Sequence, residues 1–353
     1  MILADYSFDD LRNLIIELNE KPYRATQIFS NVANGKAISE MSDIPKSLKE
    51  RLLENFSDCA LEIIEELTSK DGTKKFLYKL NDGNIIEGVL MCYNYGNTLC
   101  VSTQVGCRMG CAFCASTLQG LIRNLTPGEI LSQILVVNRR LGGNITDRKI
   151  TNVVLMGSGE PLDNYDNVIK FLALMSDKRG INISPRNLSL STCGLVPQML
   201  KLAQEGFPVN LTLSLHNPFD NKRQQIMPVA KAYTVRETVE ALDKYFKATG
   251  RRYYIEYSLI SGENDTEQCA LELKKLFASK PCHINLIRLN SVKERNLVGT
   301  SDRDAKAFME RLEKLGLSVT LRRKMGNDIE GACGQLRRKF IEKGGDFNEG
   351  QSN

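Results

Sequence analysis

The stretch TLCVSTQVGCRMGCAFC, residues 98–114, decides the fold, because it joins a predicted β-strand to three closely spaced cysteines. Residues 98–104 are the strand candidate, and Cys107, Cys111 and Cys114 follow with gaps of three and two residues. A structural zinc site needs four ligands, a disulfide needs cysteines in pairs, and a redox dithiol needs two. The spacing therefore indicates a chemistry that uses three thiolates together.

Further strand candidates follow at regular distances along the chain. They lie at residues 150–156, 187–192, 209–215, 253–260, 283–289 and 318–324. Amphipathic helical segments such as TPGEILSQILVVNRRL separate them. Repeated strand–helix units predict parallel strands with right-handed crossovers, and six such units can curve into a partial barrel. Because the chemistry of such barrels gathers at the carboxyl ends of the strands, we expect the cysteines to lie in an active-site loop.

The chain divides into four predicted parts, and its fold class is α/β. Residues 1–72 carry apolar residues at helical spacing and predict a small helical accessory domain that binds RNA. Residues 73–97 predict a β-hairpin extension around the Asn-Asp-Gly turn at 81–83. Residues 98–325 predict the partial (β/α)6 barrel, and residues 326–353 a C-terminal segment with a basic tail.

Composition describes an ordinary globular protein that works in the cytoplasm. Of 353 residues, 42% are hydrophobic and 25% are charged, and the net charge is +5. No apolar run reaches the roughly 18–20 residues that cross a bilayer, and the acidic start MILADYSFDD is unlike a secretory signal. The ten cysteines are therefore expected to be reduced, buried or metal-bound. We expect a monomer without membrane contact.

The cysteine loop resembles the Cys-x3-Cys-x2-Cys signature of the radical S-adenosylmethionine (radical SAM) enzymes, with the usual aromatic residue, Phe113, before the last cysteine. The resemblance implies one [4Fe–4S] cluster. Three of its four irons bind Cys107, Cys111 and Cys114, and the fourth iron binds SAM. A zinc site completed by His216, His283 or another cysteine, and a plain electron carrier with a fourth cysteine, are the alternatives.

The predicted SAM contacts lie at the ends of the later strands. The second strand ends in MGSGEP, residues 156–161, which resembles the glycine motif that binds the methionyl group in this superfamily. Small residues there permit close approach of the backbone. The complete set of expected contacts is Gly159, Glu160, Ser191, Ser214, Leu215, His216 and Asn290. Each residue taken singly is also explained by an ordinary strand-end hydrogen bond.

A more specific resemblance covers essentially the whole chain. It is carried by TLCVSTQVGCRMGCAFC, MGSGEPLDN, LSLHNP, INLI, DIEGACGQLR and the N-terminal YRATQIF. These motifs are similar to those of the RlmN/Cfr family of RNA adenosine methyltransferases, and they are closest to RlmN. The resemblance implies methylation of carbon 2 of an adenosine in 23S rRNA and of the tRNA adenosine 3′ of the anticodon.

The same resemblance assigns three catalytic residues. Cys333 takes a methyl group from one SAM and becomes S-methylcysteine. A second SAM supplies the radical that joins this group to the base as a protein–RNA thioether, with electrons from a reductant such as flavodoxin or ferredoxin. Cys100 then attacks the sulfur of Cys333, which frees the RNA and leaves a transient disulfide. Glu87 accepts the proton from carbon 2.

Two other functions are also compatible with these residues. The motif INLIRLN, with Arg288, is similar to Cfr enzymes, which methylate carbon 8 of the same rRNA adenosine and give antibiotic resistance. An iron–sulfur electron-transfer or RNA-binding protein without methyl transfer is the alternative from another class. Basic residues near Cys333 are expected to meet RNA phosphates. They are Arg322, Arg323, Lys324, Arg337 and Arg338.

Overall fold

The computed structural model describes residues 1–290, 297–323 and 325–329 of the chain. Cys333, Lys324, Arg337 and Arg338 lie outside the described residues, so the predictions for them are not examined by the structure. No helix within the described ranges is long and apolar enough to span a membrane.

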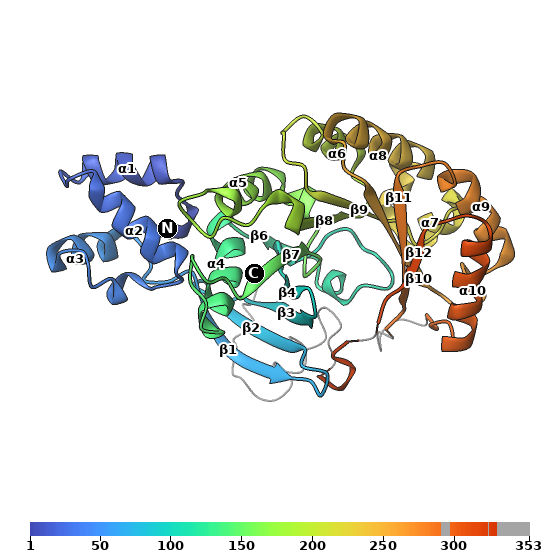
Figure 1. The fold of residues 1–353 in the computed structure, drawn as a ribbon, viewed down its shortest axis with the longest axis horizontal. Coiled ribbons are helices and arrows are strands. Elements are labelled where there is room, and N and C mark those ends of the chain that lie inside the picture. The colour runs from blue at the N-terminus through green and yellow to red at the C-terminus, as the bar shows by residue number, and fades with distance from the viewer. Residues whose placement is uncertain (291–296, 324, 330–353) are drawn as a thin grey trace, which may run out of the picture.

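A curved sheet of ten strands forms the body of the molecule (Figure 1), in the order β1-β2-β3-β4-β7-β8-β9-β10-β11-β12. Its antiparallel part comprises β1 (Leu61–Thr68), β2 (Lys74–Leu80), β3 (Ile85–Tyr93) and β4 (Gly96–Cys100). From β4 onward the neighbours are parallel: β7 (Ile150–Leu155), β8 (Leu188–Thr192), β9 (Asn210–Ser214), β10 (Tyr253–Leu259), β11 (Cys282–Arg288) and β12 (Val319–Leu321). This is the predicted partial barrel with its β extension.

Helices cover the outer face of the parallel strands (Figure 1). They are α4 (Pro127–Arg140), α5 (Tyr165–Ser176), α6 (Val196–Leu202), α8 (Val235–Thr249), α9 (Glu267–Phe277) and α10 (Asp302–Lys314). The short helix α7 (Asp220–Ile226) lies instead at the carboxyl ends of β8 and β9, where its Arg223 binds backbone carbonyl groups. Local sequence sets their ends. Thr234 and Glu237 form a capping box at the start of α8, and Gly250 ends it in the left-handed conformation with φ 66°.

Strand alternation separates the core from the inner surface of the barrel. In β10, Tyr253, Ile255 and Tyr257 are buried in the main hydrophobic core, and the Tyr257 ring stacks on Phe308 of α10. Glu256, between Ile255 and Tyr257, lines the central cavity instead. Because successive side chains point to opposite faces of a strand, β10 contributes alternately to the hydrophobic core and to the lining of the cavity.

The N-terminal helices α1 (Phe8–Glu17), α2 (Tyr23–Ala33) and α3 (Lys46–Asn55) pack around a small core of their own. The prediction that residues 1–72 are helical is wrong for Leu61–Thr68, which form the edge strand β1. A register shift between Ile63 and Glu65 interrupts the strand alternation. Apolar residues consequently recur every three positions, at 61, 64 and 67, which is a spacing typical of a helix.

The predicted strand at 98–104 ends earlier than expected, at Cys100. Residues Gln104–Gly106 form a separate strand, β5, which pairs antiparallel with β6 (Leu121–Asn124). These two short strands enclose the cysteine loop. The predicted hairpin at 73–97 is present as the antiparallel pair β2–β3.

Candidate active site

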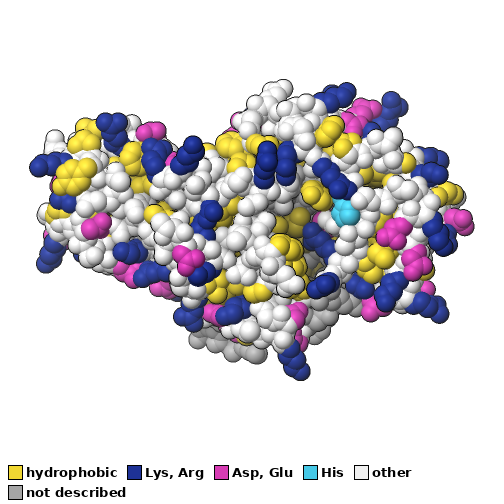
Figure 2. All heavy atoms as spheres, viewed as in Figure 1, with side chains coloured by type: hydrophobic (Ala, Val, Ile, Leu, Met, Phe, Trp, Pro, Cys, Tyr) yellow, Lys and Arg dark blue, Asp and Glu magenta, His cyan; other side chains and the backbone are white. Residues whose placement is uncertain are grey.

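A cavity of about 360 Å³ lies at the carboxyl ends of the parallel strands and holds most of the predicted site residues. Figure 2 shows the molecule hollowed near its middle, with hydrophobic side chains inside the hollow and Lys or Arg side chains around it. The predicted residues that line the cavity are Cys107, Cys111, Cys114, Gly159, Glu160, Ser191, Ser214, His216 and Asn290. Leu215 does not line it; this side chain is fully buried beside the cavity wall.

Backbone hydrogen bonds hold the cysteine loop in place. The Cys107 N–H donates to the Gly120 carbonyl at 2.9 Å, and the Ala112 N–H donates to the Ile226 carbonyl of α7 at 2.8 Å. Gly106 has φ 75°, and a Cβ atom there would lie 2.0 Å from the Gly120 oxygen. A glycine is therefore required just before Cys107.

The thiols of this loop share one electrostatic environment. Burial, with a smaller contribution from the neighbouring Cys114, raises the pKa of Cys107 to about 12. Burial also raises the pKa of Cys111, with Cys114 and Cys107 contributing. Three thiolates in such a place need a positively charged partner, because burial and mutual repulsion both disfavour the ionised form.

The glycine loop after β7 fits closely against the strand that precedes the cysteines. A Cβ atom at Gly157 would lie 2.7 Å from the Ser102 Oγ, and one at Gly159 would lie 2.6 Å from the Gln104 Cβ. Glu160 is buried, and its carboxylate accepts hydrogen bonds from the Cys193 N–H at 2.8 Å and the Leu162 N–H at 3.1 Å. Burial nevertheless raises the pKa of Glu160.

The polar residues at the later strand ends are held by one another and by the backbone. The hydroxyl groups of Ser191 and Ser214 lie 3.3 Å apart. His216 has φ 58°, and its Nδ1 accepts a hydrogen bond from the Ser258 N–H at 2.9 Å. Burial lowers the pKa of His216 to about 3, so its ring is neutral at pH 7. The ring packs edge-on against Phe113 with centroids 4.5 Å apart.

Cys100 and Glu87 are not among the residues that line the cavity; they lie on the adjacent strands β4 and β3. Both are buried, and the Glu87 charge raises the pKa of the Cys100 thiol, which burial brings to about 12. The backbone N–H of Met156 and the charge of Arg322 act in the opposite direction. The Glu87 carboxylate lies 3.5 Å from the Nζ of Lys75, which is fully buried.

The described chain that precedes Cys333 is anchored to the turn between β1 and β2. Asp328 accepts hydrogen bonds from the Ser69 hydroxyl and the Lys70 N–H, and the Gly326 N–H donates to Asp71 at 2.8 Å. The turn between β1 and β2 therefore sets the point from which the C-terminal segment begins.

Sequence reasoning missed several buried charged residues at this site. Arg223 of α7 is fully buried, and its guanidinium donates to the carbonyl oxygens of Cys193, Ser214 and Leu215 at 2.6, 3.2 and 3.1 Å. Glu256 accepts hydrogen bonds from Asn285 at 3.0 Å and pairs with Arg322 at 2.9 Å. Glu256 could have been predicted as a site residue, because it is a carboxylate within the predicted strand 253–260 and lies on the face opposite to Ile255 and Tyr257.

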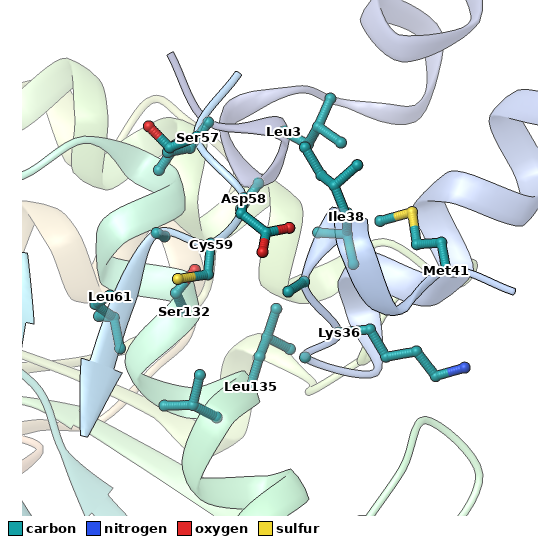
Figure 3. A pocket seen from close by; sticks show the side chains of 17 residues that line it. Leu3, Lys36, Ile38, Met41, Ser57, Asp58, Cys59, Leu61, Ser132 and Leu135 are labelled. Carbon is teal, nitrogen blue, oxygen red and sulfur yellow. The ribbon is translucent and has the colours of Figure 1, made fainter. Parts of the chain in front are cut away.

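A second cavity lies between the N-terminal helices and α4 and is shown in Figure 3. Leu3, Ile38, Met41 and Leu135 supply much of its lining, with Cys59 at one side. Its volume is only about 50 Å³, which is too small for a nucleoside. The larger cavity is therefore the candidate active site.

Comparison with known proteins agrees with this geometry. Residues 101–273 match the family described as the Radical SAM superfamily, and residues 1–57 match the family described as the Ribosomal RNA large subunit methyltransferase N-terminal domain. The crystal structure of a radical SAM methyltransferase from Sphaerobacter thermophilus superimposes with a TM-score of 0.89 at 37% identity, over 95% of this chain and 98% of that chain. The fold and the three-cysteine cavity thus define a radical SAM enzyme.

Curated relatives show which family of radical SAM enzymes the chain resembles most broadly along its length. A "probable dual-specificity RNA methyltransferase RlmN" from Clostridium perfringens (strain 13 / Type A) is 47% identical over 97% of this chain and 98% of its own length. One from Clostridium botulinum (strain Eklund 17B / Type B) is 49% identical over 96% of this chain and 97% of its own. The chain belongs to the RlmN family of radical SAM RNA methyltransferases.

Membership of the radical SAM superfamily implies a [4Fe–4S] cluster and SAM, and the cavity fits both. Its wall carries three thiols from one loop and the close-packed glycine loop. In the part of the chain that the structure describes, no three His, Cys, Asp or Glu side chains are placed to hold a single metal ion. Ligands of a four-iron cluster bind different irons and need not converge on one point.

Proposed function

We propose that this protein methylates carbon 2 of an adenosine in 23S rRNA and of the tRNA adenosine 3′ of the anticodon. The observation that carries the proposal is that Cys100 and Glu87 are both buried on adjacent strands, and that the Cys100 thiol meets the backbone N–H of Met156, a residue that lines the three-cysteine cavity. A thiol next to this wall offers a resolving group, which an electron carrier or a simple RNA-binding protein does not require. The relatives named dual-specificity RNA methyltransferases support an RNA substrate and more than one target.

In this proposal, Cys107, Cys111 and Cys114 hold the cluster. When bound, the cluster and SAM supply a methyl group and the radical chemistry that an electron-poor ring carbon requires. Gly159, Glu160, Ser191, Ser214, His216 and Asn290 line the cavity and contact SAM. Leu215 contributes through its backbone, because its side chain is buried elsewhere. Two SAM molecules are used in each turnover.

The protein's own catalytic groups then act in sequence. Cys333 carries the methyl group as a thioether and becomes linked to the base through that carbon. Glu87 takes the proton that leaves carbon 2, and Lys75 lies beside it to balance the carboxylate charge. Cys100 loses its proton and attacks the sulfur of Cys333, so that an S–S bond forms while the bond from sulfur to the base-linked carbon breaks; that carbon keeps the electron pair of the broken bond and takes up a proton, which completes the methyl group. Burial keeps the Cys100 thiol protonated at neutral pH until that step, since its pKa is about 12.

The other parts of the chain have roles in the same proposal. The helical N-terminal unit is an accessory RNA-binding domain, and a small reductant protein such as flavodoxin or ferredoxin supplies electrons. The enzyme works as a monomer in the cytoplasm.

The Cys100→Ala variant tests the proposed order of steps. Without the resolving thiol, the enzyme should remain joined to its RNA, and denaturing gels or mass spectrometry should show a covalent adduct that accumulates during turnover. Cys269→Ala, at a buried thiol outside the cavity lining, is the matched control and should turn over normally. Normal turnover of Cys100→Ala without any adduct would refute the resolving role.

Carbon 8 methylation is the second candidate, because Arg288 lines the cavity in this chain. Mass analysis of 23S rRNA and tRNA from cells with and without the gene distinguishes the two, since 2-methyladenosine and 8-methyladenosine separate by chromatography. A gene-dependent 8-methyladenosine signal would overturn the proposal in favour of the second candidate.

A further inference from the structure

Two tyrosines at the turn between β3 and β4 form a stacked pair outside the active-site cavity. The rings of Tyr93 and Tyr95 lie parallel, with an interplanar angle of 7° and centroids 4.9 Å apart. Tyr93 is half-buried and its hydroxyl contacts the Met91 sulfur, whereas Tyr95 is 73% exposed. The Tyr93 ring is thus held by its neighbours, and the Tyr95 ring, which stacks on it with one face, exposes the other face to solvent.

The turn that carries these rings is tightly defined. Tyr93 pairs with Gly96 at the end of the β3–β4 ladder. Gly96 has φ 130°, and a Cβ atom there would lie 2.2 Å from the Thr151 hydroxyl oxygen of β7. The exposed ring is therefore held in one position and offers a preformed flat surface. The pair adds no burial to the core, since neither ring belongs to a hydrophobic cluster of the described residues.

Positive charge lies beside the stack and connects it to the cavity. The charges of Arg322 and Arg323 act on the Tyr93 hydroxyl and lower its pKa, although burial raises it overall. Arg322 also lines the active-site cavity, where it pairs with Glu256. In Figure 1, β3 and β4 lie apart from β12, which ends at Leu321, just before these arginines. Arg322 therefore interacts electrostatically with the tyrosine stack and also lines the cavity.

We propose that the exposed face of Tyr95 is a stacking platform for one base of the RNA substrate, flanking the adenosine that enters the cavity, and that Arg323 binds the adjoining phosphate. The inference rests on the proposed function. An adenosine that leaves its stack also exposes its neighbour, and an aromatic ring can take over the lost stacking of that neighbour. Flat rings beside guanidinium groups suit single-stranded RNA in particular, because bases and phosphates alternate along the strand.

Binding of a fluorescently labelled RNA stem-loop with adenosine in its single-stranded loop tests the platform. With the cluster-containing enzyme, Tyr95→Ala should weaken the Kd about ten-fold, which is the usual effect of removing one base-stacking ring. Tyr95→Phe keeps the ring and should stay within about two-fold of the unchanged protein. Leu271→Ala, at an equally apolar but distant exposed position on α9, is the surface control and should have no effect.

The salt dependence of binding separates stacking from charge. Tyr95→Ala should leave the slope of log K against log salt unchanged, whereas Arg323→Ala should reduce it by about one, as expected for one lost phosphate contact. SAM cleavage measured without RNA should be the same in Tyr95→Ala as in the unchanged protein. This readout shows that the cluster and the cavity are intact.

Two outcomes would overturn the platform. One is that Tyr95→Ala binds the stem-loop as tightly as the unchanged protein, and the other is that Tyr95→Phe loses as much affinity as Tyr95→Ala. Failure of the proposed function would look different, because the unchanged protein itself would then bind or cleave SAM without methylating any RNA.

Discussion

At the scale of single residues, the pair formed by Lys75 and Glu87 shows how the fold maintains a charge in its interior. Lys75 is fully buried on β2, and its Nζ lies 3.5 Å from the Glu87 carboxylate on the neighbouring strand β3. The Glu87 backbone is fixed in turn, because its carbonyl accepts a hydrogen bond from the Ser102 hydroxyl at 2.8 Å. Ser102 also accepts from the N–H of Ser158 in the glycine loop. A proposed proton acceptor is thus joined to the proposed SAM loop by short polar contacts.

Replacing Lys75 by methionine should destabilise the protein by about 3 kcal/mol, because a buried carboxylate then loses its neighbouring positive charge. The double variant Lys75→Met with Glu87→Leu should recover part of that loss, since no charge is left buried. Urea unfolding of the three proteins measures both effects. A loss below about 1 kcal/mol in Lys75→Met would mean that the pair is not coupled.

At the scale of elements, the short helix α7 supports two loops of the site at once. Its Ile226 carbonyl holds the cysteine loop through the Ala112 N–H, and its Arg223 holds the ends of β8 and β9 through backbone carbonyl groups. A guanidinium group suits this role because its donors form a rigid planar fork. The cysteine loop and the later strand ends are therefore positioned by one element.

Arg223→Met should lower the free energy of unfolding by about 3 kcal/mol, because several buried carbonyl groups lose a charged donor. The same variant should retain less iron per chain after reconstitution, since the cysteine loop loses its support. Urea unfolding and iron analysis check the two effects. Arg236→Met, which removes an exposed ion pair with Glu240 on α8, is the matched control and should change stability by less than about 0.5 kcal/mol. Equal behaviour of the two variants would contradict a supporting role for α7.

At the scale of the whole molecule, the N-terminal helices are attached to the barrel through α4. The Arg139 guanidinium binds the Glu40 carboxylate through two contacts, at 2.6 and 2.8 Å, and the Gly35 carbonyl at 3.0 Å. Asp5 accepts a hydrogen bond from the Gly128 N–H in the first turn of the same helix at 2.8 Å. These contacts fix the orientation of a domain that has its own core.

The contact between Glu40 and Arg139 predicts a pH dependence for this attachment. Hydrogen bonds from Arg139 and from the Ala37 N–H lower the pKa of Glu40 from 4.5 to about 2. Because the folded value lies below the unfolded one, the contact contributes fully above about pH 4.5, and its contribution is lost as the pH falls through 2. An NMR titration of the Glu40 carboxyl carbon should give a midpoint near 2, and a higher midpoint that stays below 4.5 in Arg139→Gln, because the hydrogen bond from the Ala37 N–H remains. A midpoint near 4.5 in the unchanged protein would contradict this.

The local pattern of the chain predicted the barrel strands and the cysteine loop well, because both depend on short-range features. Alternation along 253–260 predicts β10, and the spacing of Cys107, Cys111 and Cys114 already specifies a loop after a strand. The edge strand β1 was not predicted, because the bulge between Ile63 and Glu65 gives its apolar residues a spacing of three, which is typical of a helix. The partners of Lys75 and Arg223 could not be predicted, because nothing in a linear sequence shows which buried charges meet.

Local sequence alone was enough to predict the order of the barrel strands and the helices between them, the three-cysteine loop and the glycine loop after β7, because each is set by residues within a few positions of one another. The contact of Glu87 with Lys75, the binding of two strand ends by Arg223, and the influence of the Arg322 charge on Tyr93 became evident only in the folded molecule. The physical reason is that the curvature of one long sheet brings together residues far apart in the chain. Hydrogen-bond geometry and burial, rather than spacing, then select the pairs that form.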